Sequence, residues 1–184
     1  MLAPGSKLGA GNMASWVVIM EALSRLVKDG PSFQLILATH PGDQTPIQLY
    51  HELVSFSPVP TTIVSKDVFT TSDMVSGADI IVEFGSSIGI NGAYQSVPVV
   101  SLGFEVLFRR FEQVSGSRMS EAVKDGLSEL VVADPGNLTE TIRRLLTPEG
   151  FAPMLAKQQK LCPMPPERGV ALRNIAEVIA KFAT

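Results

Sequence analysis

Short apolar runs alternate with longer amphipathic stretches along the whole chain. The runs are rich in isoleucine, leucine and valine, end at glycine, proline or polar residues, and cover residues 33–38, 61–64, 78–82, 99–102 and 130–133. Runs of this kind are typical of parallel strands that are buried on both faces. With residues 1–3 as the end of a first strand, the pattern predicts an α/β protein with a doubly wound parallel sheet of about six strands.

The stretches between these runs carry apolar residues at helical spacing. In residues 13–28, Trp16, Ile19 and Leu23 fall on one face of a helix, which Gly30 then ends. Pro135 stands at the first position of a later helix, where its missing N–H is not needed. Further helices are expected at residues 45–56, 71–76, 104–114, 134–146, 152–161 and 170–182, with a short one ending at residue 124. We therefore expect one domain over residues 1–184, in which residues 148–184 form a C-terminal helical tail.

Composition narrows the class of protein. The chain has 184 residues, of which 45% are apolar, and a net charge of −3, as expected for a single globular domain. No cluster of basic residues is present, so nucleic acid is not an expected partner. Cys162 is the one cysteine, which excludes an internal disulfide and fits a reducing compartment, so we expect a cytoplasmic protein. No apolar stretch is long enough to span a bilayer, and neither a metal nor a cofactor is predicted.

Two turns of small residues follow the first and fourth predicted strands. They are Pro4-Gly5-Ser6-Lys7 and Phe84-Gly85-Ser86-Ser87. In the Rossmann-like strand order 3-2-1-4-5-6, these two strands are neighbours at the point where such folds bind ligands. Glycine lets a ligand approach the backbone, and the free N–H groups at a helix start attract anions. A tight turn with no ligand is the alternative, but two such turns at one place favour a binding site.

Residues 9–14 fit the dinucleotide fingerprint G-x-G-x-x-G/A, but their surroundings do not. The fingerprint needs a strand that ends at the first glycine, whereas Pro4-Gly5-Ser6-Lys7 intervenes here. The acidic residue expected about 20 residues later, which would bind the ribose, is replaced by Thr39 and His40. We therefore expect no nicotinamide or flavin cofactor, and interpret residues 9–12 as a flexible loop over the mouth of the crevice.

A set of short motifs runs in order through residues 1–147. Pro-Gly-Ser-Lys follows the first strand, His40-Pro41 follows the second, Ala78-Asp79 opens the fourth, and Gly85-Ser86-Ser87-Ile88 and Pro98-Val99 come after it. This order resembles the C-terminal nucleotide-sugar-binding domain of GT-B glycosyltransferases. Lipid-A-disaccharide synthases, and the UDP-N-acetylglucosamine 2-epimerases that share the fold, are the families most similar in pattern.

The resemblance implies a binding role for both small-residue turns. In these families, backbone N–H groups of the turn after the fourth strand hold the diphosphate of a nucleotide-sugar, and residues 65–69 lie where the base binds. A helix N-terminus with a nearby cation suits a diphosphate, and Lys7 is the candidate cation unless it is simply solvated. The residues implied in diphosphate binding are Gly5, Ser6, Lys7, Gly85, Ser86, Ser87 and Ile88.

The chain also departs from the family pattern. Asn91 stands where a glutamate binds the ribose hydroxyls, so its hydrogen bond would lack charge assistance. His40 either contacts the sugar or phosphate or is a polar residue at a strand end. Glu83 could act as a general base near the crevice, but a buried carboxylate with satisfied hydrogen bonds is the favoured interpretation. No catalytic residue is assigned.

The resemblance gives a function and two alternatives. The sequence is expected to be the half of a glycosyltransferase that binds a nucleotide-sugar donor, with UDP as the expected nucleotide. Its acceptor domain would come from an absent N-terminal domain or a partner subunit, through which any peripheral membrane contact would be made. A UDP-sugar 2-epimerase is the first alternative, weakened because the first turn lacks the epimerase histidine. A non-catalytic nucleotide-binding or regulatory module of the same fold is the second.

Overall fold

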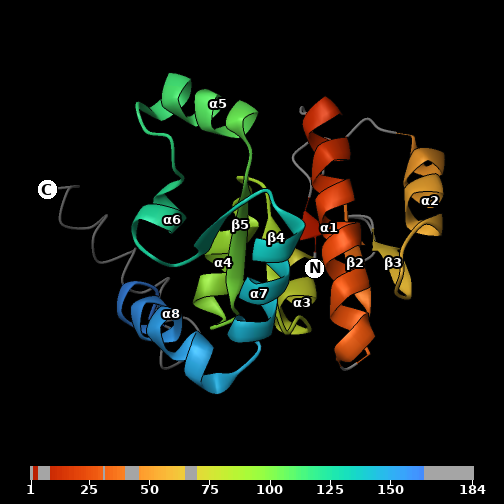
Figure 1. Cartoon of the computed structure of the whole chain (residues 1–184). Coiled ribbons are helices and arrows are strands. Elements are labelled where there is room, and N and C mark those ends of the chain that lie inside the picture. The colour runs from red at the N-terminus through yellow and green to blue at the C-terminus, as the bar shows by residue number, and fades with distance from the viewer. Residues whose placement is uncertain (1, 4–8, 31, 40–45, 65–69, 164–184) are drawn as a thin grey trace, which may run out of the picture.

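In the part of the chain that the structure describes, six parallel strands form a sheet in the order β3-β2-β1-β4-β5-β6 (Figure 1). The structure is a computed structural model and describes residues 2–3, 9–30, 32–39, 46–64 and 70–163. The strands are β1 (Leu2–Ala3), β2 (Leu35–Ala38), β3 (Thr61–Val64), β4 (Ile81–Glu83), β5 (Val99–Gly103) and β6 (Glu129–Val132). The predicted α/β class with a parallel sheet is confirmed.

Helices connect the strands and begin at recognisable caps. They are α1 (Gly9–Asp29), α2 (Ile47–Ser55), α3 (Thr71–Ser76), α4 (Ile88–Tyr94), α5 (Glu105–Ser115), α6 (Glu121–Lys124), α7 (Pro135–Leu145) and α8 (Pro148–Leu161). At the start of α3, Thr70 and Asp73 form a reciprocal capping box. At the start of α7, the Asp134 side chain accepts a 2.8 Å hydrogen bond from the Asn137 amide. These local signals explain why the sequence places both helix starts within one residue.

Neighbouring residues of β4 and β5 face opposite sides of the sheet. Ile81 pairs with Val99, and both pack with α3 and α4 in one apolar cluster. Val82 pairs with Val100, and both belong to the larger cluster that α1 and α7 cover. Because strand side chains alternate between faces, both faces of the sheet centre are buried. The apolar runs of the sequence are therefore continuous rather than alternating.

The first strand is short but central. Leu2 pairs with Leu37 of β2 and with Val82 of β4, while Ala3 pairs with Glu83. The carboxyl ends of β1 and β4 therefore lie next to each other at one edge of the sheet, as expected at the switch point of a doubly wound fold.

The prediction that residues 9–12 form a loop was wrong, because α1 begins at Gly9. Glycine in a helix costs about 0.5–1 kcal/mol relative to alanine. Burying one large apolar side chain contributes about 1.5–3 kcal/mol. The rest of α1 buries four such side chains in the main core, so the helix extends through its glycine-rich start; they are Trp16, Ile19, Leu23 and Leu26.

The C-terminal segment is described only in part. Met154 of α8 belongs to the main core, and the fully buried Gln158 donates hydrogen bonds to the carbonyl oxygens of Val97 (3.1 Å) and Leu127 (3.0 Å). These bonds fix α8 to the segments that precede β5 and β6. The helix predicted at residues 170–182 lies outside the described residues, so the helical tail and the single-domain division stay predictions.

Candidate functional site

The predicted site lies at the carboxyl edge of β1 and β4. Because Ala3 pairs with Glu83 in parallel register, the chain leaves both strands side by side at this edge. The first turn, with Gly5, Ser6 and Lys7, lies outside the described residues, as do His40 and residues 65–69. The geometry available is therefore that of the second turn, which contains Gly85, Ser86 and Ser87 and leads into α4.

Gly85 gives this turn its shape. Its φ of +71° is in the left-handed region, which glycine adopts without the steric cost that a side chain would add. The chain then reverses from β4 into α4, with Ser87 exposed at the position before the helix and Ile88 buried in the α3–α4 core. Ile88 can thus offer a ligand only its backbone.

Glu83 lies directly beneath the turn. It is the last residue of β4 and is 2% exposed. Its carboxylate accepts a 2.5 Å hydrogen bond from the Ser86 amide, one from the Gly85 amide and one from the Ser101 hydroxyl. Burial raises the pKa of Glu83, and these hydrogen bonds oppose that shift without cancelling it. The favoured interpretation of Glu83 as a satisfied buried carboxylate is confirmed.

The hydrogen bonds of Glu83 continue into the sheet. Ser101, in the middle of β5, lies 2.9 Å (Oγ to Oγ) from Ser128, which precedes β6. All three side chains are buried, and they link the end of β4, the middle of β5 and the residue before β6. Sequence reasoning did not identify Ser101 or Ser128. The available signal was a serine inside the otherwise apolar run Val99–Gly103.

Hydrogen bonds within the protein use most of the backbone donors that the sequence assigned to a diphosphate in the second turn. The amides of Gly85 and Ser86 donate to Glu83, and the Ile88 amide donates to the Ser86 hydroxyl oxygen at 3.3 Å. Only the Ser87 amide, among the four assigned donors, has no hydrogen-bond partner within the described part of the chain. A ligand on the exposed side of the turn would therefore meet the Ser87 amide and the serine hydroxyls first.

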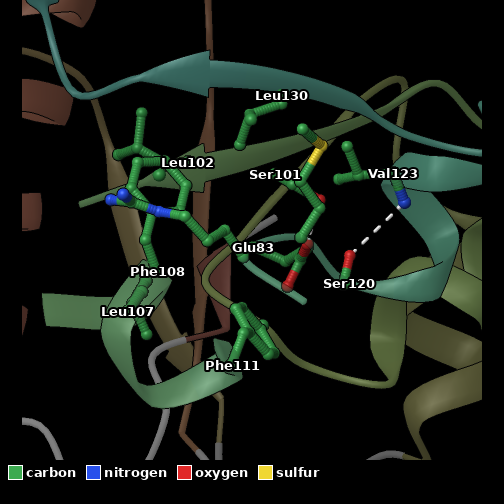
Figure 2. A pocket seen from close by; sticks show the side chains of 13 residues that line it. Glu83, Ser101, Leu102, Leu107, Phe108, Phe111, Ser120, Val123 and Leu130 are labelled. Atoms are coloured by element: carbon green, nitrogen blue, oxygen red, sulfur yellow. Dashed lines mark hydrogen bonds between the residues drawn. The ribbon is translucent and has the colours of Figure 1, made fainter. Parts of the chain in front are cut away.

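Helix α5 covers the turn on one side. An added Cβ at Gly85 would lie 2.6 Å from Cζ of Phe111, so the phenyl ring already contacts the glycine backbone. Figure 2 shows Phe108 and Phe111 of α5 around the same small pocket as Glu83 and Ser101. This pocket has a volume of about 20 Å³, enough for one water molecule but not for a diphosphate. Aromatic side chains therefore fill the space between the turn and α5, so a ligand would have to bind on another side of the turn.

The arginines of this region are held by surface ion pairs. Arg109 pairs with Glu105 at 3.2 Å, and Arg118 pairs with the same carboxylate at 2.7 Å. Arg118 also lies over the ring of Phe108, 5.6 Å from its centroid. Both side chains are more than half exposed, so Arg109 is a solvated member of an ion-pair cluster.

Asn91 and Gly92 show how α4 sits on the sheet. Asn91 is half-buried and lies one helical turn after Ser87, to whose carbonyl its amide donates at 3.3 Å. Residues four apart share a helix face, so the Asn91 side chain lies on the same side as Ser87. Gly92 is in closest contact with the strands: a Cβ there would lie 2.7 Å from both Ile81 and Val99. A methyl group at position 92 would therefore overlap these two side chains.

Comparisons with known proteins identify the fold. No family model matches the chain, and no curated protein matches it in sequence. The solved structure of CalG4, a calicheamicin glycosyltransferase, matches 99% of the chain with a TM-score of 0.58 and 13% identity. A UDP-N-acetylglucosamine 2-epimerase matches 84% of the chain (TM-score 0.54, 16% identity), and the glycotransferase of kitacinnamycin matches 86% (0.53, 17%).

The similarity of the chain to these three structures defines its class of fold. The chain has a GT-B-like fold, as the resemblance of its motifs implied. It spans 41%, 36% and 38% of the length of the three matched chains, so it corresponds to less than half of each. Among the helices that the structure describes, none combines the length and apolar character needed to cross a membrane. No cluster of metal-ligating side chains occurs within the described ranges either.

Proposed function

We propose that the chain is the donor-binding half of a glycosyltransferase that uses a nucleotide-sugar, with a UDP-sugar as the ligand. The observation that supports this most is the GT-B-like fold, which extends over nearly the whole chain. The chain matches less than half of each similar structure, which agrees with an acceptor site supplied by another domain or a partner subunit. Catalysis would then require that second half.

The proposed binding surface is the exposed side of the turn between β4 and α4. The Ser87 amide and the hydroxyl groups of Ser86 and Ser87 would bind the diphosphate, while Gly85 and Ile88 shape the turn. The side chain of Asn91, one helical turn later, would bind a ribose hydroxyl. Gly5, Ser6, Lys7 and His40 remain proposed contacts from the neighbouring strand ends.

A second candidate is a non-catalytic module of the same fold. It is favoured by one observation: Glu83 already occupies the turn amides that a diphosphate would otherwise use, and Phe111 fills the space beside Gly85. A module of this kind would retain the turn as a structural device and bind no nucleotide-sugar.

Calorimetric titration of the purified chain with UDP, UDP-N-acetylglucosamine and NAD separates these candidates. The donor-binding proposal predicts saturable binding of the uridine nucleotides and none of NAD. The variant Asn91→Ala should weaken UDP binding about two- to tenfold, the value of one neutral hydrogen bond. The matched control Asn137→Ala, at the start of α7, should leave UDP affinity unchanged. Absence of binding by both uridine nucleotides would contradict the proposal and favour the module.

A further inference from the structure

Glu83 is a buried acidic side chain that the proposed ligand contacts do not use. It is held on one side by Ser101, which in turn lies within hydrogen-bond distance of Ser128. On the other side it accepts the amide hydrogens of Gly85 and Ser86, the two residues at which the chain reverses. A carboxylate that accepts several such bonds is a strong acceptor, because charge-assisted hydrogen bonds are about twice as strong as neutral ones.

The position of Glu83 explains how the turn keeps its bend next to an exposed surface. Gly85 is exposed and has a φ of +71°. The ring of Phe111 in α5 contacts Gly85 from outside, whereas the hydrogen bonds to Glu83 reach the turn from the buried side. The hydrogen bonds that hold the turn therefore come from Glu83 in β4, which is itself linked to β5 and to the residue before β6, whereas α5 contributes a ring contact.

We propose that Glu83 is the positioning residue of the turn: by holding the amides of Gly85 and Ser86 inward, it directs the Ser87 amide and the serine hydroxyls toward the ligand side. The statement about the ligand rests on the proposed function, whereas the statement about the turn does not. Two replacements separate hydrogen bonding from burial. Glu83→Gln keeps an acceptor for the Ser86 amide and a partner for Ser101, while Glu83→Leu keeps an apolar side chain of similar size without either.

The first measurement is amide hydrogen exchange at Gly85 and Ser86, which needs no ligand. Protection of these two amides should persist in Glu83→Gln, which keeps an acceptor oxygen, and fall at least about tenfold in Glu83→Leu, which removes it. The control is Leu145→Ala in the α7 core, a variant that lowers global stability far from the turn. Compared at equal global stability, the control should keep the protection of both turn amides. Equal protection in Glu83→Leu and the control, or loss of protection in Glu83→Gln, would overturn the proposal.

The second measurement is UDP affinity by calorimetry in the same variants. Glu83→Gln should bind UDP within about threefold of the wild type, since the turn keeps its shape, and Glu83→Leu should lose at least about tenfold. Leu145→Ala should bind UDP as the wild type does. If the wild type binds no UDP, the proposed function fails while the exchange data still decide the role of Glu83. If Glu83→Leu binds UDP normally after losing amide protection, the ligand-directing part of the inference is wrong.

Discussion

Helices α4 and α5 follow neighbouring strands and start at the same edge of the sheet. They differ in how closely they pack against it. Four of the seven residues of α4 are buried, and Gly92 brings its backbone against Ile81 and Val99. Helix α5 lies further from the sheet (Figure 1), with Val114 81% exposed and its charged side chains paired in solvent. Its attachment comes mainly from Leu107, Phe108 and Phe111.

This difference in packing indicates different roles for the two helices: α4 supports the turn and α5 covers it. The turn that carries the proposed ligand contacts is continuous with the fixed helix, α4, and is anchored by Glu83. The helix that covers the turn, α5, is the one that can yield, because a ring at the end of a side chain moves more easily than packed strands. Three variants and their controls test this contrast between a fixed support and a yielding cover.

The largest expected effect is at Gly92. Replacing Gly92 by Val should lower the free energy of unfolding by about 3 kcal/mol, because the new side chain overlaps the side chains of Ile81 and Val99, which are fully buried in a packed core. The matched control is Gln113→Val on the exposed face of α5, which should cost no more than about 0.5 kcal/mol. Urea denaturation of both variants measures the difference. Equal costs would show that α4 is no more tightly held than α5.

A smaller effect is expected at Gly85. Gly85→Ala should cost about 1–2 kcal/mol, because a side chain is unfavourable at a positive φ. The new Cβ would also meet the ring of Phe111, but that ring can move with α5. In a double-mutant cycle with Phe111→Ala, the coupling energy should therefore stay below about 0.5 kcal/mol. A coupling energy above about 1 kcal/mol would mean that α5 is a rigid cover.

The smallest expected effect is a change in how the free energy of unfolding depends on pH. Burial raises the pKa of folded Glu83 above its ordinary value of 4.5, so the unfolded chain releases this proton more readily. As the pH rises from 4.5 toward the folded pKa, the wild type should lose stability relative to Glu83→Gln, and the difference should then level off. Denaturation of both proteins across this pH range measures it. A difference that does not change with pH would show that Glu83 has the same pKa in both states.

Much of the fold could be predicted because its signals are local. The capping residues Thr70 and Asp134 and the apolar run of β5 place their elements without reference to the rest of the chain. The start of α1 at Gly9 could not be predicted, because packing of residues further along the helix overrides the glycine penalty.

The site was predictable only as far as its backbone shape. The sequence identifies the turn at Gly85, since glycine and serine after a buried strand are a local signal. It does not reveal that the turn amides are bonded to Glu83, which is also held by Ser101 from another strand, 18 residues later. The contact of Phe111 with Gly85, across 26 residues of sequence, is likewise set by how α5 packs.

The two-residue strand β1 has a consequence for how the molecule is assembled. Within the described residues, β2–β3 and β4–β6 are joined by backbone hydrogen bonds only through this strand. Pairing of Leu2 with Leu37 closes a shorter chain loop than pairing of Leu2 with Val82 does, and the longer loop costs more entropy to close. The smallest strand of the sheet thus joins its two halves, and its pairing with β4 closes the longer of the two chain loops.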